Sequence, residues 1–257
     1  MSDIILETRG LTKHYGGLHA LEGADFQLER GEHVAVVGDN GAGKSTFVRQ
    51  ITAVERRTAG EIYFEGQPVN FASPLEAREA GIETVFQTLA LADDLDVPSN
   101  LYLGREIIRI PLGPFSILDG RAMREATKRA LERTAVKIPD ISRTIRHMSG
   151  GQRQCVAIAR TAAFVSKLII MDEPTAALCV QETAQVENII RGLKERGVPL
   201  ILISHNLRQV FDLVDRIVVF RRGRIVASLK REETDGNDIV SYITGVRGSA
   251  GEQPAFA

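Results

Sequence analysis

A glycine-rich segment at residues 38–45 constrains this chain more than any other feature. It reads GDNGAGKS and lies between the apolar run His33 to Val37 and a helical pattern at residues 46–51. Its glycines let the backbone turn inward, so that successive N–H groups and a helix N-terminus converge on phosphate oxygens. We therefore predict a strand, a phosphate-binding turn and a helix, with Lys44 at the β- and γ-phosphates and the Ser45 hydroxyl on Mg²⁺. The alternative, a turn that merely joins a strand to a helix, is weaker because both flanking elements are present.

Strand and helix patterns alternate over most of the sequence, as in α/β proteins with a parallel sheet. We expect strands at residues 4–11, 20–28, 61–64, 82–86, 168–171 and 199–203, and a hairpin at 216–220 and 224–229. We expect helices after Ser73, which begins a capping box with Pro74 at the first helical position, after Asp119, after Ser149, and at 238–244. A further helix, with Val186, Ile189, Ile190 and Leu193 on one face, is expected to end at Gly197.

The strand pattern disappears between residues 88 and 147, which we interpret as a helical lobe broken by Pro111, Pro114 and Pro139. The predicted organisation is residues 1–87 for an N-terminal β subdomain and the first part of the core, 88–147 for the lobe, 148–247 for the rest of the core, and 248–257 for a flexible tail.

Polar residues follow three of the predicted strands at their carboxyl ends. Gln87 follows 82–86, Asp172 and Glu173 follow the fully apolar 168–171, and His205 follows 199–203. Ligands of parallel α/β sheets bind at this edge. Neighbouring strand residues point to opposite sides, so one carboxylate could hold Mg²⁺ while the other addresses a water molecule. Each of these residues, taken alone, is more often a solvated or structural group.

Two further features could serve a nucleotide. Ser149-Gly150-Gly151-Gln152 begins a predicted helix whose Ser N-cap and two glycines leave bare N–H groups at its start, a second anion site. Tyr15 precedes the turn at Gly16 and Gly17, where an aromatic ring either packs against the protein or stacks on a base. For each feature alone, the ordinary structural interpretation is favoured.

Composition narrows the functional classes. With 32 basic and 33 acidic residues, the formal charge of −1 argues against binding to nucleic acid by bulk electrostatics. Cys155 and Cys179 show no metal-ligand spacing and lie beside apolar residues, so we expect two small buried side chains in a reducing compartment. No secretory leader and no run of about eighteen apolar residues is evident, so any membrane role is expected to be peripheral.

Taken together, these motifs resemble the nucleotide-binding subunits of ABC transporters over nearly the whole chain. The resemblance implies a P-loop ATPase with a RecA-like core, an antiparallel β subdomain and an inserted helical lobe. It also implies that Tyr15 stacks on adenine, that Gln87 senses the γ-phosphate and Mg²⁺, that Asp172 holds the metal, that Glu173 is the general base, and that His205 contacts the γ-phosphate. The implied nucleotide-binding residues are Gly38, Asn40, Gly41, Ala42, Gly43, Lys44, Ser45, Thr46, Ser149, Gly150, Gly151 and Gln152.

The chain departs from the family pattern at Met148, where Leu is commoner, and at Cys179, where Asp is usual and Gly occurs in some importers. The segments 85–97, 100–106 and 203–208 look like ATPases of bacterial ribose, xylose and fructose importers, and the single-domain form is similar to the fructose type.

Such a protein is expected to form a head-to-tail homodimer with two ATP molecules, on the cytoplasmic face of the membrane. Its expected partners are permease subunits and, indirectly, an external solute-binding protein, with a monosaccharide as the carried solute and no nucleic acid. The alternatives left open are a P-loop kinase, which shares the phosphate turn, and a soluble ABC-type ATPase outside transport.

Overall fold

The computed structural model describes residues 3–86, 89–134, 136, 138–164, 166–176 and 178–247. It divides into two compact units. The core unit comprises Met1–Thr84, Lys167–Glu173 and Lys194–Ala257, and the helical unit comprises Val85–Ser166 and Pro174–Leu193.

The core unit is organised around a six-stranded sheet in the order β12-β11-β3-β10-β9-β6. Strand β10 pairs in parallel with both β3 and β9, β11 pairs in parallel with β3, and β12 is antiparallel to β11. Every residue of β3 and β10 is buried, as expected for parallel strands covered on both faces. The strands are β3 (His33–Val37), β6 (Ile82–Val85), β9 (Leu168–Asp172), β10 (Leu200–Ile203), β11 (Arg216–Arg221) and β12 (Arg224–Lys230).

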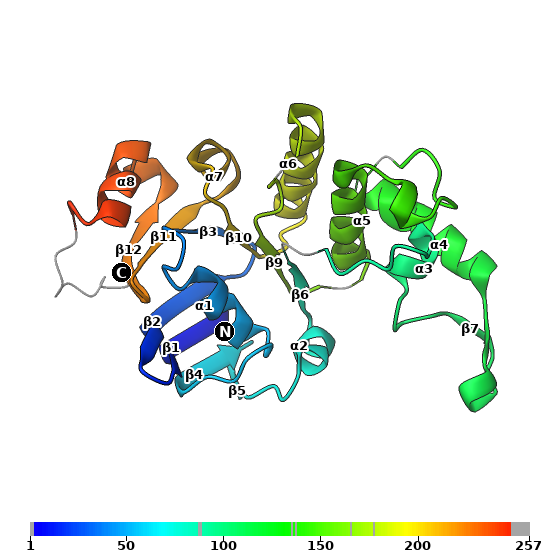
Figure 1. Cartoon of the computed structure of the whole chain (residues 1–257), viewed down its shortest axis with the longest axis horizontal. Coiled ribbons are helices and arrows are strands. Elements are labelled where there is room, and N and C mark those ends of the chain that lie inside the picture. The colour runs from blue at the N-terminus through cyan, green and yellow to red at the C-terminus, as the bar shows by residue number, and fades with distance from the viewer. Residues whose placement is uncertain are drawn as a thin grey trace. The chain divides into compact units, whose positions relative to one another are not determined.

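A second, antiparallel sheet in the order β2-β1-β4-β5 lies beside helix α1 (Lys44–Ile51) in Figure 1. Its strands are β1 (Ile4–Tyr15), β2 (Leu18–Glu29), β4 (Ala59–Phe64) and β5 (Gln67–Val69). Phe47 of α1 joins the two sheets: its ring centroid lies 5.2 Å from that of Phe26 and 5.3 Å from that of Phe220. Helix α1 is thus held between the sheets by its apolar face, and its N-terminus is fixed at the end of β3.

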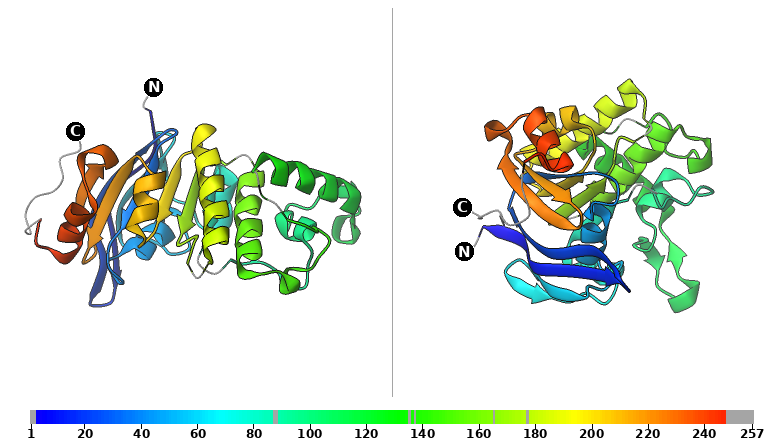
Figure 2. Two further views of the ribbon diagram at one scale, coloured as in Figure 1. Left: turned by 90° about the horizontal axis from the view of Figure 1, so that it is seen from above. Right: turned by 60° about the vertical axis from the view of Figure 1, so that its left-hand side comes forward.

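Three short helices complete the core unit: α2 (Pro74–Ala80), α7 (Leu207–Leu213) and α8 (Gly236–Thr244). Helices α7 and α8 lie on the face of the six-stranded sheet opposite α1 (Figures 1 and 2). The predicted cap of α2 is present, since the Ser73 hydroxyl accepts from the Glu76 N–H. The Glu76 carboxylate, however, accepts from the N–H of Ala72 rather than from that of Ser73.

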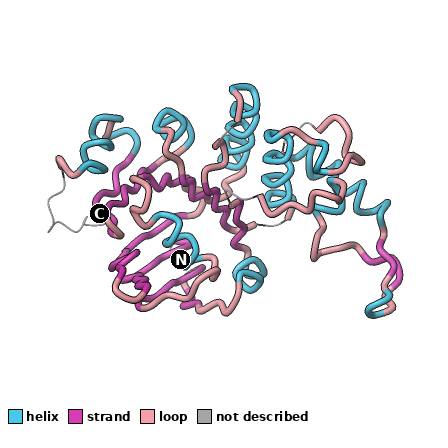
Figure 3. Tube along the Cα trace, in the orientation of Figure 1, coloured by secondary structure: helices cyan, strands magenta, loops and turns pink. Residues whose placement is uncertain are grey.

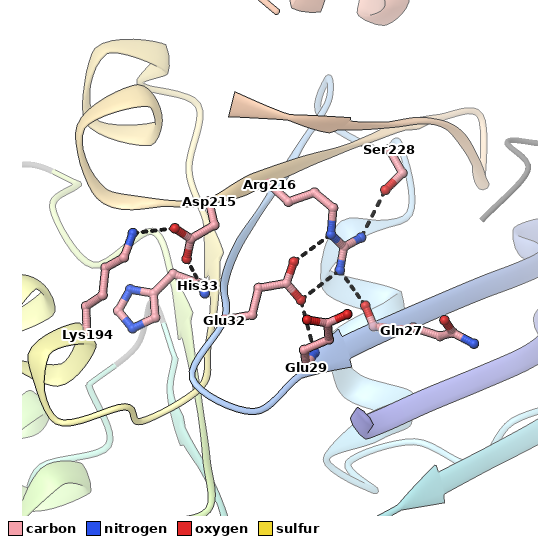
Figure 4. Close-up of polar contacts among 8 residues, drawn as sticks. All are labelled: Gln27, Glu29, Glu32, His33, Lys194, Asp215, Arg216 and Ser228. Atoms are coloured by element: carbon pink, nitrogen blue, oxygen red, sulfur yellow. Dashed lines mark hydrogen bonds and ion pairs between the residues drawn. The ribbon is translucent and has the colours of Figure 1, made fainter. Parts of the chain in front are cut away.

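A polar network ties the amino ends of β3 and β11 together (Figure 4). The Arg216 guanidinium donates to both carboxylate oxygens of Glu32, at 2.7 and 3.0 Å, to the Ser228 hydroxyl at 2.9 Å and to the Gln27 carbonyl at 2.6 Å. Nearby, Asp215 accepts from the backbone N–H of His33 and from Lys194. The network holds the end of the sheet opposite the glycine-rich loop.

The helical unit packs around a small core of Val97, Leu101, Ala130, Ile145, Met148 and Val156. It contains α3 (Val97–Leu101), α4 (Gly120–Arg133) and α5 (Gly150–Ala163), and α6 (Val180–Glu195) begins in it. Asp96, Asp119 and Ser149 cap α3, α4 and α5 with their side chains. The helices predicted after Asp119 and Ser149 are therefore confirmed in position and in mechanism.

Two sequence expectations about this unit are wrong. Residues 88–147 include a two-stranded hairpin, β7 (Ile108–Ile110) with β8 (Ile117–Leu118), seen as short magenta segments in Figure 3. These strands are too short and too exposed to show a burial period. Cys155 is buried, but Cys179 is exposed, because its segment precedes α6 rather than lying in the core.

No helix of the described residues is long and apolar enough to cross a membrane. The tail predicted at 248–257 lies outside the described residues.

Candidate functional site

The loop between β3 and α1 requires glycine at defined positions. Gly38, Gly41 and Gly43 have φ values of 147°, 78° and 104°, which residues with a side chain rarely adopt. A Cβ atom on Gly38 would lie 2.3 Å from the carbonyl oxygen of Phe220, and one on Gly43 would lie 2.8 Å from that of Ala20. Because backbone atoms occupy these places, the loop adopts its inward turn only with glycine.

The N-terminus of α1 is open to an anion. Gly43 is the N-cap residue, and no side chain caps the helix, so its first N–H groups have no partner from a capping residue. The Lys44 ammonium donates to the carbonyls of Gly38, at 2.7 Å, and Asp39, at 2.9 Å, inside the loop. Burial lowers the pKa of Lys44, although Glu173 and Asp172 favour its charged form. The loop therefore offers main-chain donors, a helix dipole and a cation, which fits a polyphosphate.

A carboxylate and a hydroxyl meet beside the loop. The Ser45 side chain lies beside Asp172, the last residue of β9, and favours its charged form. Burial, and next the charge of Glu173, raise the pKa of Asp172. No group of three or more His, Cys, Asp or Glu residues that could enclose a metal is present among the described residues. One carboxylate and one hydroxyl suit Mg²⁺, which keeps several waters and takes further ligands from phosphate oxygens.

Glu173 and His205 face each other across neighbouring strand ends. The His205 Nδ1 atom lies 2.8 Å from a carboxylate oxygen of Glu173, and the backbone N–H of Glu173 donates to the Ile203 carbonyl. Glu173 has a φ of 50°, an uncommon conformation for a residue with a side chain. The Glu173 side chain is largely covered, whereas that of His205 is 74% exposed. The pair can hold or move a proton at the mouth of the phosphate loop.

Tyr15 lies at the end of β1, close to the start of α1. Its hydroxyl hydrogen-bonds to Glu55 and also contacts the Thr46 side chain. Burial and the Glu55 hydrogen bond raise its pKa. Tyr15 as a whole residue is 42% exposed, and the Lys13 ammonium lies 5.0 Å from its ring centroid. An exposed aromatic face next to the phosphate loop suits stacking with a base.

Ser149 caps α5 in a complete capping box. Its hydroxyl accepts from the Gln152 N–H, and the Gln152 side chain accepts from the Ser149 N–H. The N–H group of Gly151, expected to be bare, has a partner: the Glu182 carboxylate of α6 accepts from it and from the Ser149 hydroxyl. The sequence gives no sign of this contact, which joins residues 33 positions apart.

The predicted site residues fall into two groups. The core unit brings together Tyr15, the loop from Gly38 to Thr46, Asp172, Glu173 and His205, while Ser149 to Gln152 belong to the helical unit. Gln87 lies outside the described residues. Glu55 and Glu182 were not among the predicted residues, since nothing in their local pattern distinguishes them from other surface carboxylates.

Comparison with known proteins gives consistent results. A family model described as ABC transporter matches residues 21–176. The fructose import ATP-binding protein FrcA of Rhizobium meliloti is 47% identical over 95% of either chain, and the xylose/arabinose import ATP-binding protein XylG of Sulfolobus acidocaldarius is 42% identical over the same shares. The ribose import ATP-binding protein RbsA 1 of Rubrobacter xylanophilus is 39% identical over 89% of this chain but only 44% of its own length.

Solved structures agree with the fold. A nucleotide-free ATP-binding cassette from an ABC transporter has a TM-score of 0.81 at 28% identity, with 97% of this chain and 100% of that chain covered. An ABC transporter cassette in its ADP conformation has a TM-score of 0.79 at 28% identity, with coverage of 95% and 96%. The expected fold, a P-loop cassette with a mixed α/β sheet, is thereby confirmed.

Proposed function

This chain belongs to the ABC transporter family and is an ATP-binding ATPase of that family, and we propose that it drives the import of a monosaccharide. The observation that carries this proposal is the arrangement in the core unit. The glycine loop with Lys44 and Ser45 lies beside the strand ends that bear Asp172, Glu173 and His205. The import names of the relatives in fructose, xylose/arabinose and ribose transport support a small sugar and do not favour the kinase or the non-transport ATPase.

In the proposed reaction, the loop N–H groups and Lys44 bind the β- and γ-phosphates, and Tyr15 stacks on adenine. Ser45 and Asp172, with Gln87, would hold Mg²⁺, which supplies charge neutralisation on the phosphate oxygens. Glu173 orients the attacking water and accepts its proton. His205 holds Glu173 through the 2.8 Å contact and addresses the γ-phosphate from its exposed side.

The proposed working form is a head-to-tail homodimer. The Ser149–Gln152 turn of one copy receives the γ-phosphate that the loop of the other copy holds, so hydrolysis removes the charge that bridges the two copies. We further propose that permease subunits anchor this dimer peripherally at the cytoplasmic face of the membrane. A solute-binding protein outside the cell then supplies the sugar.

Two measurements test the function. The purified protein with Mg²⁺ and ATP should release inorganic phosphate, and supplying monosaccharides as acceptors should yield no sugar phosphate. Cells lacking the protein should lose uptake of one labelled monosaccharide and regain it with the wild type but not with Glu173→Gln. Transfer of phosphate to an acceptor would identify a kinase, and uptake that is normal for pentoses and hexoses alike would reject the transport role.

A further inference from the structure

The N-terminal turn of α5 is already occupied by an anion that belongs to the chain. One carboxylate oxygen of Glu182 lies 2.9 Å from the Ser149 hydroxyl and 3.1 Å from the Gly151 nitrogen. The other oxygen lies 3.3 Å from the Cys179 nitrogen. All four residues belong to the helical unit, so the contact depends only on how that unit folds.

The capping box leaves the Ser149 hydroxyl proton available to the Glu182 carboxylate. The Ser149 hydroxyl accepts from the Gln152 N–H, so its own proton is free to be donated to Glu182. Gly151 makes the approach possible, because a Cβ atom there would lie 2.1 Å from the Glu182 carboxyl carbon. The Ser149 hydrogen bond, and next the Cys179 N–H, lower the pKa of Glu182, so the group is an anion near neutral pH.

The same donors are the ones that the proposed dimer needs. A γ-phosphate oxygen from the facing copy would have to accept from the Ser149 hydroxyl and the Gly151 N–H, and a donor atom cannot make its full hydrogen bond to two anions at once. Two anions at one helix N-terminus also repel each other.

We propose that Glu182 is a built-in competitor of the γ-phosphate, an autoinhibitory contact that keeps the α5 turn closed until ATP on a second copy displaces it. This inference rests on the proposed ATP-bridged dimer. Competition by Glu182 divides the α5 turns into closed and competent forms. Each turn reduces the apparent affinity of dimerisation by its competent fraction, and a dimer needs two such turns. Glu182 thereby sets the ATP concentration at which two copies associate.

If Glu182 only braces the turn, removing it should change dimerisation in the opposite direction. If the carboxylate only ties α6 to the start of α5, its removal loosens the turn and weakens dimerisation. If it competes with phosphate, its removal strengthens dimerisation and leaves ATP binding to the separate monomer unchanged, because the loop that binds ATP lies in the core unit.

The test uses the full chain with Glu173→Gln, which should preserve the ATP-bound dimer. Dimer formation is followed by analytical ultracentrifugation during a titration with Mg²⁺-ATP. Adding Glu182→Ala should lower the ATP concentration for half-dimerisation about three- to ten-fold, the effect of one or two net hydrogen bonds, and Glu182→Gln should lower it less. Glu187→Gln is the matched control, since it removes an equal charge from the same helix at a residue that contacts Arg191 instead.

The possible results distinguish a failure of the competitor role from a failure of the ATP-bridged dimer. An unchanged or higher midpoint for both Glu182 variants, or an equal shift with Glu187→Gln, would overturn the competitor role. A Glu173→Gln protein that stays monomeric at saturating ATP would instead reject the ATP-bridged dimer itself, and the competitor role with it. Circular dichroism checks that each variant is folded, and the more conservative Glu182→Gln decides the question if Glu182→Ala is not.

Discussion

Replacing Arg216 with methionine should cost this protein more stability than replacing any ordinary surface arginine. The Arg216 side chain is 17% exposed, that of its partner Glu32 is 14% exposed, and four hydrogen bonds join Arg216 to Glu32, Ser228 and Gln27. Breaking a fully buried ion pair costs about 3–5 kcal/mol, mostly because one charge is left without a partner. Partial contact of both side chains with water reduces this estimate to about 2–3 kcal/mol.

The assay is urea unfolding followed by circular dichroism, with the free energy extrapolated to water. For a chain of this size the same loss corresponds to a fall in Tm of about 5–10 °C. Arg224→Met is the matched control, because Arg224 pairs with Glu22 while both side chains are well exposed, and its midpoint should not change measurably. The double variant Arg216→Met with Glu32→Gln should recover at least about 1 kcal/mol relative to the sum of the single losses, because the stranded charge is gone. Additive losses, or equal losses for Arg216→Met and Arg224→Met, would refute the reasoning.

Three further predictions concern the site and the pH response. Glu173→Gln should reduce phosphate release about 10²–10⁴-fold, the usual contribution of a general base, while ATP affinity by equilibrium dialysis stays near that of the wild type. Lys44→Ala should weaken ATP binding about 10- to 100-fold, since it removes a charge-assisted contact to the phosphates. Burial lowers the pKa of His33, so the folded state binds its proton less readily than the unfolded chain does. Stability from this group is therefore complete above about pH 6.5 and is lost as the pH falls below it, and His33→Gln should flatten the slope of unfolding free energy between about pH 6.5 and 5.

Each of these three predictions would be contradicted by a specific result. Full turnover in Glu173→Gln would remove Glu173 from the proposed role, and unchanged ATP affinity in Lys44→Ala would argue against the phosphate loop as the binding site. A pH slope as steep in His33→Gln as in the wild type would assign acid sensitivity to other groups.

Local sequence patterns were sufficient to predict most helices and strands and the chemistry of the glycine-rich loop. The apolar runs at 33–37, 168–171 and 199–203 form buried parallel strands, and Ser73, Asp119 and Ser149 cap their helices as predicted, although Glu76 accepts from Ala72 instead of completing the capping box at Ser73. These signals are local, because helix caps and burial periods are set by residues within a few positions of each other. The order of strand ends also predicts that Asp172, Glu173 and His205 lie on one edge of the sheet.

Contacts between residues far apart in the chain could not be predicted from the sequence, because they depend on how the whole chain folds. Arg216 and Glu32 are 184 positions apart, and Glu182 reaches Ser149 across 33. Neither contact produces a periodic pattern in the sequence. A single exposed or half-buried charged residue looks the same in sequence whether or not a partner residue folds against it. The short β7–β8 hairpin and the exposure of Cys179 also depend on the tertiary fold. Burial at those positions is set by how the chain closes around its core rather than by neighbouring residues.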